Sequence, residues 1–328
     1  MDSKMTEIDQ RGDLILRLGA PKTNDLRVCS RAIACASTVF DKALFGSSEE
    51  CQKQAGEWIV ELHEDNVALM IVLLAIAHGC ERIIPTRVTV PELFELLVIG
   101  ERYKMRRLFR PYLRRWIPNN KNVKLIDDKM MLAWIAREIG STTLFEAAMI
   151  DIARHLTNDG IVGYFIGDKN EDKGSVFNSC IRSSGILDIA AAKQTDLLKR
   201  VLEPIQELTR RALRGQSCQK YLHGAREAQL CADALLGLLV AGCKQVGVDP
   251  NIMCLAEEVD LASYPYPVSK VFWAVGLMRY HTIAGHAECS VMNTMKIDTW
   301  RAFTTLAVAM SPSEQMYFRM QAEISGFS

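Results

Sequence analysis

The chain has 328 residues, with 39 basic and 39 acidic side chains, so its formal charge is zero at pH 7. This length is typical of two domains, and the balanced charge argues against a dedicated nucleic-acid-binding protein. The longest apolar run, 67–77, is shorter than the roughly 20 residues that cross a bilayer, and the polar first residues lack the apolar segment of a signal peptide. We therefore expect a soluble intracellular protein, cytoplasmic or nuclear, without a membrane partner.

The ten cysteines are spread along the chain and form no CxxC pair. Without a secretion signal, this distribution favours reduced thiols over a disulfide framework. Several lie among aliphatic neighbours, where a free cysteine behaves as a small hydrophobic residue. These are Cys29, Cys35, Cys80, Cys231 and Cys243.

Strand and helix patterns alternate in the first part of the chain. Residues 13–18 (DLILRL) alternate as a half-buried strand does, and 20–25 (APKTND) is typical of a hairpin connection. The remaining expected elements are a returning strand at 26–28, a helix at 30–40, a short helix through 43–45 that ends at Gly46, a loop at 47–57 and a strand at 58–62.

Helical patterns then continue to the end of the chain. An apolar helix is expected at 66–78, and another after Thr89 and Pro91, with Thr89 as its cap. Five residues are expected in the core: Leu93, Leu96, Leu97, Leu108 and Trp116. The polar segment 118–122 indicates a domain boundary, and 168–174 a mobile loop.

Three stretches resemble a BTB/POZ domain. They are the opening strand at 12–16, the helical hairpin at 26–46 with Ala36, Ser37 and Phe40 at its signature positions, and the helix pair at 90–117. Later stretches, 132–145 and 268–291, resemble the helical region of uncharacterised filamentous-fungal BTB proteins.

The resemblance implies an α+β fold: a BTB-like domain at 10–117, a linker at 118–129 and an all-α domain at 130–328. It implies a non-catalytic protein-interaction module or scaffold with protein partners. Dimeric relatives exchange an extra N-terminal strand and helix, for which the dozen residues before the first strand leave little room. A swapped dimer is therefore not expected, and self-association stays open.

Some members of the family recruit a cullin through an apolar-x-Glu motif in the loop after the hairpin. The matching residues here are Ser48, Glu49 and Glu50, preceded by Phe45. Glu50 fits the motif, whereas Ser48 lacks the contact area of an apolar anchor. A cullin-RING ubiquitin ligase adaptor is thus an alternative function, with a solvated acidic loop as the simpler interpretation of these residues.

One dense group of potential metal ligands occurs near the end of the chain, at His281, His286 and Cys289. Cys218 and His223 can supply further ligands from elsewhere. A structural zinc needs four such donors, and local spacing delivers only two or three. Ordinary core or capping roles are the competing interpretation, so the expected cofactor is none, with a structural zinc as the alternative.

A run of basic residues at 104–115 offers a nuclear-import or acidic-partner patch, and a nuclear transcription-related regulator is the second alternative function. Amphipathic spacing favours a solvated helix face instead.

The sequence carries no GxGxxG, GxxxxGK[ST], HExxH or GxSxG motif. A Cys289–His286 pair lacks an orienting third group, so we expect no enzyme activity.

Overall fold

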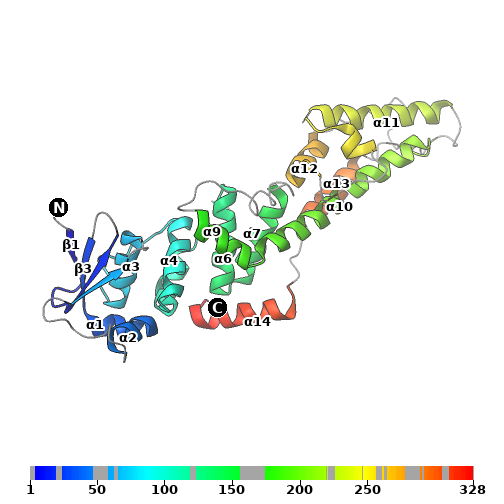
Figure 1. Ribbon diagram of the computed structural model, residues 1–328. Helices are drawn as coiled ribbons and strands as arrows, with labels where there is room; N and C mark the ends of the chain where they lie inside the picture. Colours follow the sequence, from blue (N-terminus) through cyan, green and yellow to red (C-terminus); the bar gives the residue numbers. More distant parts are fainter. Residues whose placement is uncertain are drawn as a thin grey trace. The chain divides into compact units, whose positions relative to one another are not determined.

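The computed structural model describes residues 4–19, 24–46, 58–62, 66–118, 123–155, 174–218, 220, 226–245, 247–255, 261, 264–277, 289, 292–304 and 310–327. Two compact units divide the chain: unit 1 comprises Met1–Phe145 and Met310–Ser328, and unit 2 comprises Glu146–Ala309. The described chain is mostly helical, with one small mixed sheet near the N-terminus (Figure 1), which confirms the α+β class.

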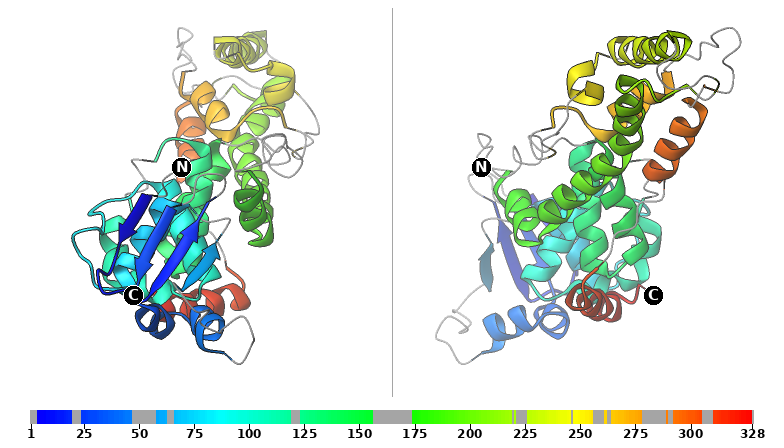
Figure 2. Two further views of the ribbon diagram at one scale, coloured as in Figure 1. Left: turned by 60° about the vertical axis from the view of Figure 1, so that its left-hand side comes forward. Right: turned by 90° about the vertical axis from the view of Figure 1, so that its right-hand side faces the viewer.

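The sheet of unit 1 has the strand order β1-β3-β2-β4, and Figure 2 shows the four strands side by side. The strands are β1 (Lys4–Glu7), β2 (Leu14–Leu18), β3 (Asn24–Val28) and β4 (Ile59–Leu62). β2 pairs antiparallel with β3 and parallel with β4. The expected strands at 13–18 and 58–62 are confirmed, and the returning strand begins earlier than 26.

β1 was not predicted from the sequence. The dozen residues before the first expected strand leave little room for an extra strand and helix, yet β1 pairs in parallel with β3 from Lys4↔Asn24 to Glu7↔Arg27. Its polar four-residue stretch, KMTE, has no alternation that would predict a strand. β3 offers its free edge as a template, so strand pairing rather than local preference decides the conformation.

The helical hairpin after β3 consists of α1 (Ser30–Ala36) and α2 (Thr38–Phe45). The single helix expected at 30–40 is wrong, because the chain breaks at Ser37, which has extended backbone angles. The Ser37 hydroxyl accepts the N–H of Phe40 and donates to the carbonyl of Tyr103. Serine is a favoured N-cap, so this residue begins a second helix instead of continuing the first.

The next two helices of unit 1 are α3 (Val67–Ala77) and α4 (Val90–Arg102). α4 begins with the expected cap. Thr89 Oγ1 accepts the N–H of Glu92, and a Glu92 carboxylate oxygen accepts the N–H of Thr89 at 2.7 Å. This reciprocal pair is a capping box, which satisfies two backbone donors at once.

We expect Thr89→Ala to lower the free energy of unfolding by about 1 kcal/mol at pH 7. The hydrogen bonds from Thr89 lower the pKa of Glu92, so their contribution is present above the unfolded-state pKa and lost as the pH falls through the folded-state pKa. The destabilisation should therefore shrink in acid. Urea unfolding at several pH values measures it, with the exposed, non-capping Thr86→Ala as control. Equal effects of both variants would contradict the capping role.

After α4 the chain forms a 3-10 turn, η2 (Arg106–Phe109), and then α5 (Arg110–Trp116). Of the five predicted core residues, Leu93, Leu96, Leu97 and Trp116 are buried. Leu108 is only partly buried, because the 3-10 turn changes the helical register that its prediction assumed.

The expected linker at 118–129 does not coincide with the division between the two units, which falls after Phe145. Residues 119–122 lie outside the described ranges, and α6 (Ile126–Ile139) begins soon after them. α6 packs on α4 and on the C-terminal helix α14 (Pro312–Ser325). The last helix of the chain thus belongs to unit 1.

Unit 2 is built around α10 (Ile186–Leu213), α11 (Arg226–Gln245), α12 (Val268–Leu277) and α13 (Met292–Thr304). Three further described elements join them: α7 (Thr142–His155), which crosses the division, α9 (Gly174–Ser183) and the π-helical turn η4 (Asn251–Leu255). One apolar cluster centred on α10 holds most of these helices together. The loop expected at 168–174 falls almost wholly outside the described residues.

Within the described ranges, we find no helix with both the length and the apolar character that crossing a membrane requires.

Candidate functional sites

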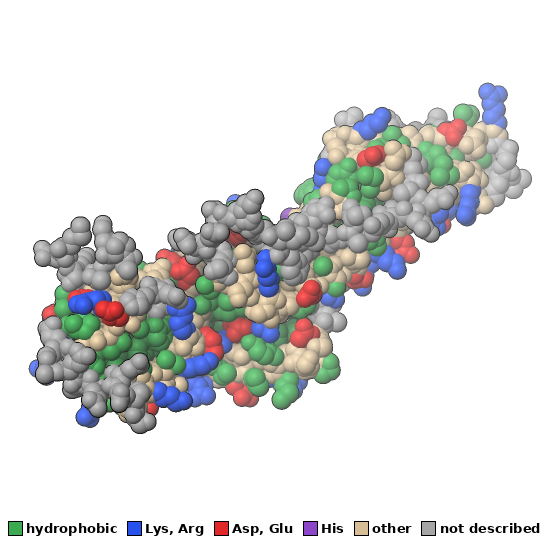
Figure 3. Space-filling model, viewed as in Figure 1, with side chains coloured by type: hydrophobic (Ala, Val, Ile, Leu, Met, Phe, Trp, Pro, Cys, Tyr) green, Lys and Arg blue, Asp and Glu red, His purple; other side chains and the backbone are tan. Residues whose placement is uncertain are grey.

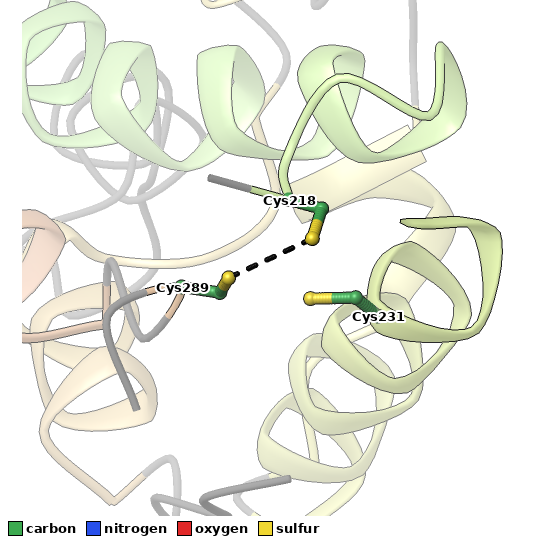
Figure 4. A group of neighbouring side chains, drawn as sticks. All are labelled: Cys218, Cys231 and Cys289. Carbon is green, nitrogen blue, oxygen red and sulfur yellow. Dashed lines mark hydrogen bonds between the residues drawn. The ribbon is translucent and has the colours of Figure 1, made fainter. Parts of the chain in front are cut away.

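Three cysteines meet inside unit 2, as Figure 4 shows. Cys218 follows α10, Cys231 lies on α11, and Cys289 lies between α12 and α13. The sulfur atoms are all within 4.8 Å of one another, and those of Cys218 and Cys289 are 3.8 Å apart. Each residue is 5% exposed. Three sulfur atoms, which are soft metal ligands, therefore surround one buried point.

The environment of the Cys231 thiol opposes its ionisation. Burial, and then the neighbouring thiols of Cys289 and Cys218, raise the pKa of the Cys231 thiol to about 12. A thiol in such surroundings stays protonated at neutral pH and is a poor nucleophile. A cation placed among the three sulfur atoms reverses this preference, because it stabilises the thiolates.

Only part of this group was predicted. Of the expected ligands, the structure brings together Cys218 and Cys289, while His281, His286 and the further candidate His223 lie outside the described residues. Cys231 had been interpreted as a small hydrophobic residue. Its spacing from the other two matches no local ligand motif, so the sequence held no signal for it. Cys35 was also interpreted as a small hydrophobic residue, and this is wrong because Cys35 is exposed.

The predicted partner-binding loop is only partly described. Phe45 ends α2 and is half exposed, and its ring meets that of Trp58 edge to face at 5.9 Å. Ser48, Glu49 and Glu50 lie outside the described residues.

A second aromatic surface, absent from the predictions, lies on unit 2. Trp273 on α12 and Trp300 on α13 are 64% and 57% exposed, and Leu277 and Ile297 on the same helices are also exposed. A groove of about 300 Å³ runs between these helices. Its described lining residues are Phe272, Val275, Gly276, Lys296, Ile297, Thr299 and Trp300. Hydrophobic side chains also reach the surface among charged ones in the view of Figure 3.

The groove is apolar with two polar features. Lys296 is the one charged side chain among its described lining residues, and its ammonium donates to the carbonyl of Gly276 at 3.1 Å. The hydroxyl of Thr299 is fully buried and finds no hydrogen-bond partner within the described parts of the chain. Trp300 lines the groove, and Trp273 follows the lining residue Phe272 on α12.

The basic run at 104–115 is not a uniformly solvated face. Arg106 is largely buried and pairs with Glu138 at 3.0 Å, and Arg110 donates to the carbonyls of Glu323 and Ile324 on α14. Arg115 lies over the ring of Tyr112. Two of the arginines therefore hold other helices of unit 1, which reduces the charge available to a nucleic acid.

Comparisons of the chain with protein-family models, with curated proteins and with solved structures found no match.

Proposed function

We propose that the protein is a non-catalytic interaction module that binds a partner protein through the groove between α12 and α13. The observation that carries this proposal is the exposed Trp300 in the lining of that groove, together with the exposed Trp273, which follows the lining residue Phe272 on α12. Grouped exposed apolar residues mark interaction surfaces, whereas single ones are ordinary, and tryptophan is enriched at the energetic centres of interfaces.

The occupant we propose is an amphipathic helix of the partner protein. An apolar side chain of that helix fills the space lined by Phe272, Val275 and Ile297, and a carboxylate on its rim faces Lys296. A groove between two helices suits this mode of recognition, in which side chains at helical spacing enter the groove. The single lining cation favours an acidic neighbour over a basic one.

For unit 1 we propose a BTB/POZ-like domain, supported by its element order: β2, β3, the hairpin α1–α2, β4 and α3. A cullin-RING adaptor stays the alternative, because its motif at 48–50 lies outside the described residues. The nuclear regulator is less favoured, since Arg106 and Arg110 make internal contacts.

The proposal predicts that Trp300→Ala weakens partner binding about 30-fold, a loss of about 2 kcal/mol. Proteins that co-purify with the tagged full chain from its native cells are identified, and the most reproducible is then produced pure for titration calorimetry. Trp300 is more than half exposed, so its truncation should leave the melting temperature nearly unchanged.

Two variants serve as matched controls. Met316→Ala removes a similarly exposed apolar side chain from α14 of unit 1 and should bind normally. Phe45→Ala tests the hairpin surface. Loss of binding in Phe45→Ala with none in Trp300→Ala would overturn the groove as the binding surface. A cullin that co-purifies with the intact chain and is lost in Glu50→Ala would establish the adaptor instead.

A further inference from the structure

We propose that Cys218, Cys231 and Cys289 bind one zinc ion as thiolates in unit 2, with water as the fourth ligand. The three residues come from three separate segments, and Figure 4 shows their sulfur atoms turned toward a common centre. Cys218 and Cys289 are 71 residues apart in the chain. Only the tertiary structure brings them together.

The distances fit tetrahedral coordination. With Zn–S bonds of about 2.3 Å, tetrahedral angles place two sulfur ligands about 3.8 Å apart. The sulfur atoms of Cys218 and Cys289 are 3.8 Å apart, and no pair in the group exceeds 4.8 Å. A shift of about 1 Å or less at Cys231 therefore completes the three-sulfur face of a tetrahedron.

Apolar packing explains the group poorly. Among the residues that the structure describes, the three cysteines and Ala228 form a separate buried cluster, distinct from the large apolar cluster on α10. Four small side chains bury little apolar area, so their contacts contribute little to holding three chain segments together. Metal–thiolate bonds supply that stabilisation directly, and closing a loop as long as 218–289 is where such a cross-link acts most strongly.

The donor set selects the metal. Thiolates are soft ligands that favour zinc over magnesium or calcium, which take oxygen donors. On binding, each of the three thiols releases its proton to solvent, and the sulfur lone pair forms the bond to zinc. Water fills the fourth tetrahedral position, as at other zinc sites with three protein ligands. No change in oxidation state is involved.

The test is the metal content of the full chain, purified with a reducing agent and zinc and then freed of loose metal by gel filtration. Elemental analysis should find about one zinc per chain. Cys231→Ser should reduce this to nearly none. Cys243→Ser is the matched control, because Cys243 is a buried cysteine on the same helix, α11, but lies in the large apolar cluster. It should retain the metal.

A second readout needs no variant. Cobalt exchanged into the wild-type chain should show a thiolate-to-metal charge-transfer band whose intensity corresponds to three sulfur ligands, even if Cys231→Ser fails to fold. Three results would overturn the proposal: folded wild-type chain without stoichiometric zinc, equal metal loss in Cys243→Ser and Cys231→Ser, or a Cys218–Cys289 disulfide as the native state by non-reducing peptide mapping.

Discussion

Glu138→Ala is expected to lower the free energy of unfolding of unit 1 by about 3 kcal/mol, because it removes the buried carboxylate that pairs with Arg106 and leaves that buried arginine only the half-exposed Glu101 as counter-ion. The carboxylate of Glu138 on α6 has three partners. It forms an ion pair with Arg106 at 3.0 Å, and it accepts hydrogen bonds from Arg137 at 2.9 Å and from the Tyr317 hydroxyl at 2.8 Å. The side chains of Glu138 and Arg106 are each only 10% exposed.

The control for Glu138→Ala is Glu101→Ala, because both carboxylates pair with Arg106. Glu101 also pairs with Arg106, at 3.3 Å, but its side chain is 49% exposed. Glu101→Ala should therefore cost less than about 1 kcal/mol. Because the chain has two compact units, hydrogen–deuterium exchange of peptides from unit 1 measures the effect more directly than one global transition. A Glu138→Ala effect no larger than that of Glu101→Ala would contradict the network's role.

Tyr317 provides a pH readout of the same network. Burial, and then the charge and hydrogen bond of Glu138, raise the pKa of Tyr317 to about 12. A pKa raised by folding means that the protonated hydroxyl stabilises the fold below about pH 10, and that this contribution is lost between about pH 10 and 12. In Glu138→Ala the pKa of Tyr317 should fall, which an ultraviolet titration against a Tyr317→Phe reference detects.

Gly140→Ala is the second substitution with a large expected effect. Gly140 ends α6 with φ +78°, in the left-handed region, and its backbone lies against α14. An added Cβ would meet the backbone N of Ala322 and the carbonyl O of Phe318, and would lie 2.7 Å from the Ala322 Cα. Backbone atoms cannot move aside as a flexible side chain can, so α14 has to shift.

The loss of stability that we expect in Gly140→Ala has two causes, and the control variant Gly79→Ala separates them. Gly79 has φ +69°, and a Cβ added there would meet no atom of the described residues within 4 Å. Its variant should therefore lose only about 1–2 kcal/mol from the left-handed conformation. Gly140→Ala should lose roughly 1–3 kcal/mol more from the forced displacement of α14. Faster hydrogen exchange confined to 312–325 identifies that displacement. Equal losses in the two variants would mean that α14 is not packed closely there.

The docking of α14 links these two predictions. Besides Tyr317 and the approach to Gly140, Ser325 donates to the carbonyl of Ile139 at 2.7 Å, and the rings of Phe318 and Phe145 lie 5.1 Å apart. The last helix of the chain thus completes the core of the first unit. Truncation of the chain after 309 removes all of these contacts together.

Local sequence patterns predicted those elements whose conformation is decided by residues that are neighbours in the chain. Strand alternation predicted β2, the run WIVEL predicted β4, and Thr89 with Pro91 predicted where α4 begins. In each case the residues that decide the conformation are neighbours in the chain, so their preference survives without knowledge of the fold.

The tertiary structure alone decided the features that depend on distant residues. β1 forms because β3 offers it an edge, α14 belongs to unit 1 because it packs on α6, and Cys231 joins Cys218 and Cys289 because three segments of unit 2 converge. A sequence states which side chains exist and how they are spaced along the chain. It does not state which of them meet, since that depends on the packing energy of the whole unit rather than on any local preference.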